Sequence, residues 1–132
     1  MRVIDSSSLA KFTLKEPNWE LVRNVLSERC ISIELSVKEV VNSIWKRALM
    51  HELTLERARQ TLARFLSERP FEITEQGELY EEAFKIALKT KSTIYDSLYV
   101  ELARRKSLVL VTSDRVQARV AKETGVETLF IE

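Results

Sequence analysis

The chain has 132 residues, 45% hydrophobic and 31% charged, with a formal net charge of +1. This balance excludes intrinsic disorder and argues against an indiscriminate polyanion binder. The single cysteine, Cys30, excludes an internal disulfide, and no apolar run approaches the roughly 18 residues that a membrane span needs. We expect one domain over residues 1–132, without a signal peptide, in the reducing cytoplasm.

The apolar pattern predicts strands that alternate with helices. In chain order these are a strand at 3–5, helices at 7–13 and 18–28, a strand at 30–33, helices at 36–50 and 54–67, a strand at 71–73, helices at 75–90 and 94–105, a strand at 108–112, a helix at 114–123 and a strand at 128–131. The run LVLVT at 108–112 is typical of a strand covered on both faces. This alternation indicates an α/β fold, with a mostly parallel sheet between two layers of helices.

Four acidic residues fall where strands end or helices begin. Asp5 ends the first strand, and Asp114 follows the LVLVT strand. Glu39 lies in the first turn of the helix after CISI, and Asp96 in the first turn of the helix that begins near Thr93. A parallel sheet brings the three acids that directly follow a strand to one edge, where ligands bind in such folds. Asp96 follows a helix-to-helix turn, so the pattern alone does not place it there.

Helix capping explains each acid taken singly. The stretches 36–39 and 93–96 both match the capping box, in which a hydroxyl caps one backbone N–H and an acid reaches back to another. The stretch 114–117 matches it too, and Asp5 can cap the helix that starts among its serines. Each cap contributes about 1 kcal/mol, which is sufficient reason for one acid to be present.

Taken together, the four acids indicate a divalent cation. Carboxylates near one point repel one another, and some take up protons unless a cation joins them. Mg²⁺ prefers about six oxygen ligands and keeps several waters, so a few carboxylates suffice. Capping is compatible with this role, because helix amino ends favour the ionised carboxylate. A zinc site is not expected, since the chain has no Cys/His cluster.

Four motifs in order resemble the PIN domain, in particular the VapC-type toxins of prokaryotic toxin–antitoxin pairs. The motifs are VIDSSSLAKF, SVKEVVNSIWK, STIYDSLYVELARR and LVLVTSDRVQARVAKETG. Their order, their spacing and the length of the chain all agree with that family, so the resemblance covers essentially the whole chain. The segment Ile33-Glu34-Leu35 departs from the pattern, because many members carry a proline before the glutamate.

The resemblance implies a three-layered α/β/α fold with a five-stranded parallel sheet, and Mg²⁺- or Mn²⁺-dependent endoribonuclease activity. The matching acids are Asp5, Glu39, Asp96 and Asp114, and the matching supporting positions are Ser7, Asn42 and Thr112. VapC-like proteins usually form homodimers and are held inactive by a small antitoxin protein. The apolar faces of helices 54–67 and 18–28 offer a groove for such a partner.

We expect Asp5 to be the central metal ligand, because it stands on the most rigid element. Asp96 and Asp114 would complete the metal set, and Glu39 would bind the metal or orient the attacking water. Asn42 lies one turn after Glu39, and its amide can hold a carboxylate or a phosphate, or be merely solvated. The hydroxyls of Ser7 and Thr112 can orient Asp5 and Asp114, or cap local structure.

RNA, with tRNA or ribosomal RNA expected, would be bound by basic residues around this edge. The candidates are Lys11, Lys38, Lys46, Arg47, Arg115 and Arg119, each of which can also be an ordinary solvated residue. Trp19 and Trp45 can stack bases, although core or interface packing explains them better. Packing or a subunit contact likewise explains Tyr95 and Tyr99 better than chemistry does.

Three other functions remain open at this stage. A PIN nuclease of RNA processing would carry the same residues. A PIN-like module without activity would bind RNA or act as a scaffold. An Asp-phosphorylated enzyme or receiver also places an aspartate after its first strand. However, such phosphatases require Asp-x-Asp, whereas Asp5 is followed by Ser6 and Ser7, and the acidic pair that receivers carry before the first strand is missing.

Overall fold

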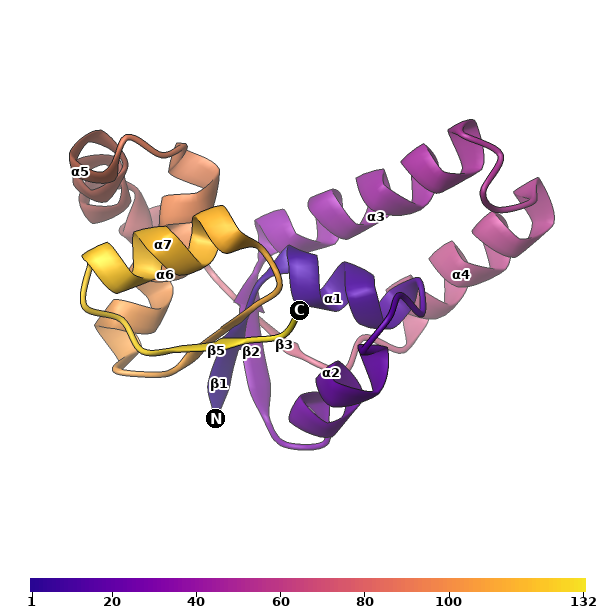
Figure 1. Cartoon of the computed structure of the whole chain (residues 1–132), viewed down its shortest axis with the longest axis horizontal. Helices are drawn as coiled ribbons and strands as arrows, with labels where there is room; N and C mark the ends of the chain where they lie inside the picture. Colours follow the sequence, from indigo (N-terminus) through magenta and orange to yellow (C-terminus); the bar gives the residue numbers. More distant parts are fainter.

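The computed structural model describes residues 1–132 as a five-stranded sheet, all parallel, in the order β3-β2-β1-β4-β5 (Figure 1). The strands are β1 (Arg2–Ile4), β2 (Cys30–Ile33), β3 (Glu72–Thr74), β4 (Leu110–Thr112) and β5 (Thr128–Phe130). The helices are α1 (Ser6–Thr13), α2 (Trp19–Leu26), α3 (Glu34–Leu49), α4 (Leu55–Ser67), the 3₁₀ helix η1 (Gly77–Leu79), α5 (Tyr80–Thr90), α6 (Ile94–Lys106) and α7 (Arg115–Glu123). The predicted α/β class and its parallel sheet are confirmed.

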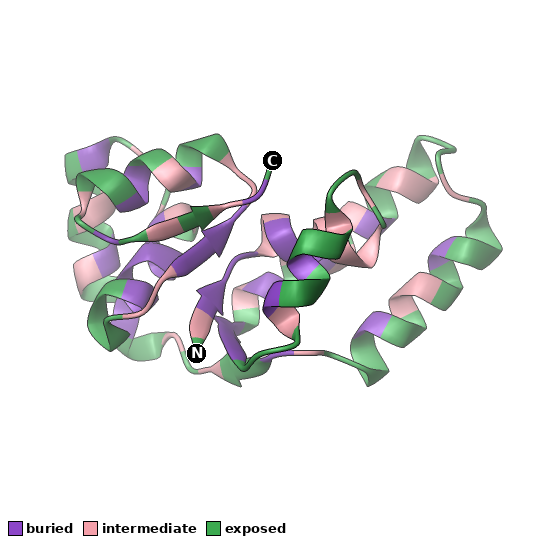
Figure 2. Ribbon diagram, turned by 60° about the horizontal axis from the view of Figure 1, so that its bottom comes forward, coloured by how far each residue is buried: buried purple, intermediate pink, exposed green.

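Helices cover both faces of the sheet because successive strand residues point to opposite sides. Val3 belongs to an apolar cluster formed with α5, α6 and α7, whereas Ile4 belongs to a second cluster formed with α1, α2, α3 and α4. Figure 1 shows these two groups of helices on the two sides of the sheet. Figure 2 shows the central strands buried and the outward faces of the helices exposed.

Several element boundaries differ from the predicted ones. Helix α3 begins at Glu34, two residues before the predicted start, with Ile33 in extended conformation as its N-cap. The segment predicted as one helix at 75–90 contains η1 followed by α5. Gly125 follows the C-cap of α7 with a φ of +79°, a left-handed conformation that suits glycine and ends the helix.

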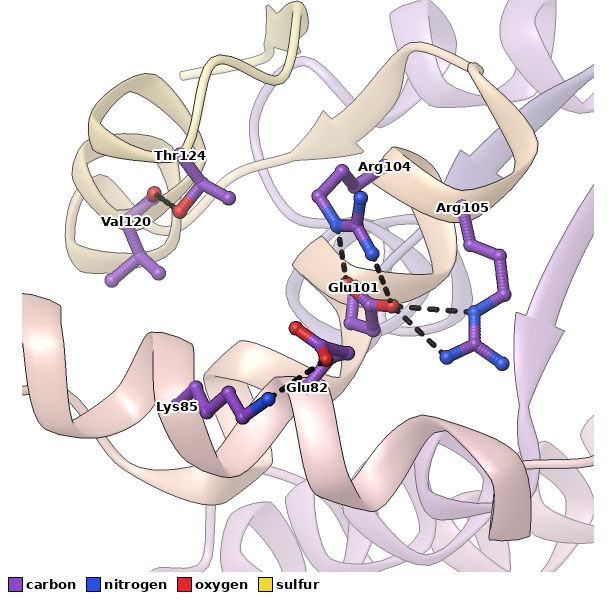
Figure 3. Close-up of polar contacts among 7 residues, drawn as sticks. All are labelled: Glu82, Lys85, Glu101, Arg104, Arg105, Val120 and Thr124. Atoms are coloured by element: carbon purple, nitrogen blue, oxygen red, sulfur yellow. Dashed lines mark hydrogen bonds and ion pairs between the residues drawn. The ribbon is translucent and has the colours of Figure 1, made fainter.

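Helix α6 carries a fully buried acidic side chain, Glu101. Arg104 donates two hydrogen bonds to its carboxylate, from Nε to Oε1 at 2.6 Å and from Nη2 to Oε2 at 2.9 Å. Arg105 adds a third from Nε to Oε2 at 3.2 Å, and Figure 3 shows both guanidinium groups directed at the carboxylate. Nearby, Glu82 and Lys85 form a more exposed pair at 3.2 Å on α5. Two cations therefore compensate the buried charge of Glu101.

Candidate active site

Asp5 stands where the central strand passes into α1, with its side chain only 3% exposed. Its backbone N–H continues the sheet by donating to the carbonyl of Val111 at 3.1 Å. Its carboxylate accepts hydrogen bonds from the Ser7 hydroxyl at 2.7 Å, the Thr112 hydroxyl at 2.5 Å and the Ser8 N–H at 3.1 Å. No lysine or arginine forms an ion pair with it.

Burial without a cationic partner changes the acidity of Asp5. Desolvation raises the pKa of its carboxyl group from 3.8 to about 6, although the three hydrogen bonds lower it. The negative charge of Asp114 raises this pKa further, because the two acids lie on neighbouring strand ends. Protonation or a bound cation would each relieve this cost of burying the charge of Asp5.

Glu39 reaches the same edge from α3. One of its carboxylate oxygens, Oε1, accepts hydrogen bonds from the Ser6 hydroxyl at 2.9 Å and from the Tyr99 hydroxyl at 2.6 Å. Burial and the Glu39 charge raise the pKa of Tyr99 far above its ordinary value, so that this hydroxyl remains a donor. The capping box predicted at 36–39 is wrong. Because α3 starts at Glu34, Ser36 lies inside the helix and donates to the Ile33 carbonyl instead.

Asp96 and Asp114 both stand at the first turn of a helix. Asp114 is the N-cap of α7 and accepts from the N–H groups of Val116 and Gln117 at 2.7 and 3.2 Å. Thr93 is the N-cap of α6, and its hydroxyl lies 3.2 Å from the Asp96 carboxylate. Capping thus accounts for the local structure at both helix starts.

The four acids act on one another electrostatically. Burial raises the pKa of Asp96, and the charges of Asp114 and Glu39 raise it further, whereas the Thr93 hydrogen bond and the charge of Arg119 lower it. The structure therefore brings Asp96 to the same edge as the other three acids, which the sequence pattern alone did not place. The chain contains only three aspartates, Asp5, Asp96 and Asp114, and all of them stand here.

The supporting residues are placed in two different ways. Ser7 and Thr112 both contact the Asp5 carboxylate, and the Ser7 hydroxyl also accepts from the N–H of Ser113 at 2.8 Å. Asn42 is exposed, and its side chain makes no hydrogen bond. Sequence reasoning missed Ser6 and Tyr99, which bind Glu39. Tyr99 does pack in the core, as predicted, but its hydroxyl serves this edge.

The basic candidates also differ in their surroundings. Lys11 and Lys46 line a groove of about 480 Å³ between α1 and α3, which Ser7 and Ser113 also line. Two glutamates, Glu16 and Glu52, line it as well, and both are paired with Arg47. Lys38 and Lys46 are exposed and form no ion pair. Arg47, Arg115 and Arg119 are each paired with a glutamate.

The residues at this edge fit a hard divalent cation by their chemistry. All donors are oxygens, and the raised pKa values of Asp5 and Asp96 report repulsion and desolvation that a cation would relieve. As the side chains lie, no three His, Cys, Asp or Glu residues stand close enough together to hold a metal ion. Binding would therefore require the acid side chains to move closer together than they lie here.

Comparison with known proteins identifies the fold and its family. The PIN domain family model matches residues 2–123. The chain belongs to the PIN domain family. This PIN domain has a parallel sheet with acids at the carboxyl ends of β1 and β4, and the resemblance found in its four motifs is confirmed.

Relatives of this PIN domain include two proteins of Pyrobaculum aerophilum. It is 29% identical to Exonuclease VapC9 over 130 residues, which cover 98% of the chain and 92% of VapC9. It is 30% identical to Ribonuclease VapC3 over 118 residues, which cover 86% of the chain and 88% of VapC3. The crystal structure of PAE2754 from the same organism superposes with a TM-score of 0.73 at 26% identity, covering 96% of this chain and 87% of that one.

No helix of this PIN domain combines the length and apolar character needed to cross a membrane.

Proposed function

We propose that this PIN domain is a metal-dependent endoribonuclease and the toxin of a toxin–antitoxin pair. The observation that carries the proposal is the set of four electrostatically coupled carboxylates at one sheet edge, centred on a buried Asp5 that has no cationic partner. The names of the relatives VapC9 and VapC3 support nuclease chemistry.

Asp5, Asp96, Asp114 and Glu39 would hold Mg²⁺ or Mn²⁺. When bound, such an ion polarises the phosphodiester and activates water for attack, which removes the need for a catalytic histidine. Ser7 and Thr112 fix the Asp5 carboxylate at the end of the central strand. Glu39 orients the attacking water, and the exposed amide of Asn42 is available to a phosphate oxygen.

The test is cleavage of a mixed pool of tRNA and ribosomal RNA in Mn²⁺, in EDTA, and with Asp96→Asn. Glu127→Gln is the matched control, because Glu127 is exposed and forms no ion pair. Cleavage by the wild type and the control, lost in EDTA and in Asp96→Asn, is expected. If the folded wild type binds no Mn²⁺ in calorimetry, the proposal gives way to a PIN-like module that binds RNA without cutting it.

The RNA strand would follow the groove between α1 and α3. This groove joins the hydroxyls of Ser7 and Ser113 at the acidic edge to Lys11 and Lys46, two cations that can neutralise phosphates. Lys38 and Arg115 flank the same edge as further contacts, although Arg115 is engaged by Glu132 at 2.6 Å. A decrease of RNA affinity with salt, and a smaller salt dependence in Lys46→Gln, would support this path.

An antitoxin would dock in a second groove, of about 480 Å³, between the end of α1 and α4. This groove differs from the one predicted between helices 54–67 and 18–28. The lining includes Phe12 and Phe65 but also three cations, Lys15, Arg57 and Arg64, and no residue of α2. Charge complementarity therefore favours an acidic partner segment. Arg57→Glu with Arg64→Glu should abolish inhibition by the antitoxin, and inhibition that persists would contradict this placement.

The homodimer expected of this protein would use the exposed apolar stripe of α5. Tyr80, Phe84 and Leu88 stand four residues apart on this helix and are 47%, 59% and 68% exposed. Such a stripe is typical of a surface that a partner covers. Light scattering should give a dimer for the wild type and a monomer for Phe84→Glu. In either state, the protein would act on RNA in the cytoplasm. A wild-type monomer would contradict the dimer.

A further inference from the structure

Two hydroxyl groups from different parts of the chain meet on one oxygen of Glu39. Ser6 lies at the start of α1, 33 positions before Glu39, and Tyr99 lies on α6, 60 positions after it. Both donate to Oε1, at 2.9 and 2.6 Å, and no donor of the protein contacts Oε2. A carboxylate oxygen has about two acceptor positions, so these two bonds fill Oε1 and leave Oε2 free.

We propose that Tyr99 and Ser6 are positioning residues which make Glu39 act through a single oxygen, Oε2. The inference rests on the proposed divalent-ion chemistry and adds residues that the four motifs do not assign. With Oε1 occupied, Glu39 offers one oxygen to a cation or a water molecule, and the carboxylate cannot rotate to chelate with both oxygens. The site thus gains a ligand of fixed direction from a long side chain that would otherwise sample several rotamers.

The surroundings of Tyr99 favour this role over simple packing. The residue is only 3% exposed and packs in the cluster under α5, α6 and α7, but its hydroxyl crosses toward the acidic edge. A phenylalanine would fill the same core space. The hydroxyl is not needed to fill this space, and burying it is unfavourable unless it has a hydrogen-bond partner. That partner is Glu39.

The test separates the hydroxyl from the ring. Tyr99→Phe keeps the ring, and Tyr95→Phe is the matched control, since Tyr95 is a 56% exposed tyrosine on the same helix beside Asp96. In calorimetry, Tyr99→Phe is expected to weaken Mn²⁺ binding about tenfold, as is usual when a residue that orients a metal ligand is lost. Tyr95→Phe is expected to bind like the wild type. Equal Mn²⁺ affinity in all three proteins overturns the proposal.

A double-mutant cycle assigns the effect to Glu39. In a Glu39→Gln background, Tyr99→Phe should change the Mn²⁺ dissociation constant less than twofold, because Tyr99 acts only through the carboxylate. A loss that stays tenfold in that background would show that Tyr99 acts by another route and would overturn the inference.

A metal-free measurement keeps the inference testable if the proposed function fails. Urea unfolding in EDTA of the wild type, Tyr99→Phe, Glu39→Gln and the double variant gives the coupling of the two side chains. We expect the coupling to change the unfolding equilibrium constant at least about fivefold, as for a hydrogen bond to a charged group. Wild type that binds no Mn²⁺ would refute the proposed function alone, whereas absent coupling would refute the positioning of Glu39.

Discussion

Two buried carboxylates of this protein differ in whether they have cationic partners. Glu101 on α6 is fully buried and carries two guanidinium partners, Arg104 and Arg105. Asp5 at the end of β1 is 3% exposed, and its partners are two neutral hydroxyls and a backbone N–H. Its charged neighbour is a second acid, Asp114, which raises its pKa.

The difference is the one expected between an acid that stabilises the fold and an acid that belongs to the proposed metal site. A buried charge is costly unless it is paired and hydrogen-bonded, and Glu101 meets both conditions within the chain. Asp5 is hydrogen-bonded but has no cationic partner within the chain. A cation from solution could supply the missing positive charge. Buried acids without cationic partners are candidates for functional sites for this reason.

Replacing each of the two acids with its amide tests the contrast between Asp5 and Glu101 most directly. Asp5→Asn should lower RNA cleavage by about 10³-fold or more while the protein stays folded, because the proposed site loses its central ligand. Glu101→Gln should cleave at nearly the wild-type rate. Cleavage rates and circular dichroism of both variants measure this, and an active Asp5→Asn would remove the functional half of the comparison.

For the free energy of unfolding, we expect the Glu101 variant to be the more strongly affected of the two. Glu101→Gln leaves Arg104 and Arg105 without a carboxylate, and we expect a loss of about 2 kcal/mol in the free energy of unfolding. Glu82→Gln, which breaks the more exposed pair with Lys85, is the matched control and should cost less than about 0.5 kcal/mol. Chemical denaturation measures both. Equal losses in the free energy of unfolding would mean that the buried Glu101 network stabilises the protein no more than the exposed Glu82–Lys85 pair.

The pH dependence of stability tests the environment of the Asp5 carboxyl group. A carboxyl group whose pKa rises on folding stabilises the native state in its protonated form. Its contribution is complete below about pH 4 and is lost as the pH rises through about 6. The rise from 3.8 to about 6 corresponds to about 3 kcal/mol.

In EDTA, the stability of Asp5→Asn relative to wild type should therefore increase by roughly that amount between pH 4 and pH 8. Urea unfolding at a series of pH values measures the difference between the two proteins, in which the other titrating groups largely cancel. Saturating Mn²⁺ should reduce the difference at pH 8. A difference that does not change with pH would show that the Asp5 carboxyl group is not desolvated in the folded protein.

The smallest expected effect concerns the exposed cations. Lys46→Gln should raise the KM for RNA about two- to threefold and lower the salt slope of binding by about one, since one phosphate contact is lost. Lys89→Gln on α5 is the matched control, exposed and free of ion pairs. Identical salt slopes in the two variants would exclude the groove between α1 and α3 as the RNA path.

The sequence predicted most of this fold because its signals are local. Apolar runs and helical periodicity located the five strands and the seven α-helices, although the separate 3₁₀ helix η1 before α5 was not predicted. Parallel topology then brought Asp5 and Asp114 to one edge. Composition held a further signal. Of 20 acidic residues only three are aspartates, which leaves 17 glutamates, and those three gather at the site.

What the sequence did not predict depends on contacts between distant segments. The start of α3 at Glu34 moved Glu39 out of the first turn and removed its capping role. The hydrogen bonds of Ser6 and Tyr99 to Glu39 join three helices that only the finished fold brings together. Helical periodicity predicted a partner groove from the apolar faces of helices 54–67 and 18–28, whereas the groove between α1 and α4 is lined by Lys15, Arg57 and Arg64.

The backbone of Asp5 has a further consequence, for hydrogen exchange. Its amide donates to Val111 within the central ladder, whereas the amides of Asp96 and Asp114 are bonded to threonine hydroxyls at helix starts. Central-strand amides exchange through global opening, and helix ends exchange by local fraying. The Asp5 amide should therefore be among the slowest to exchange and the other two much faster. Asp5 would then have a rigid backbone and Asp96 and Asp114 more mobile ones. The latter two acids could move toward a cation at Asp5 without disturbing the sheet.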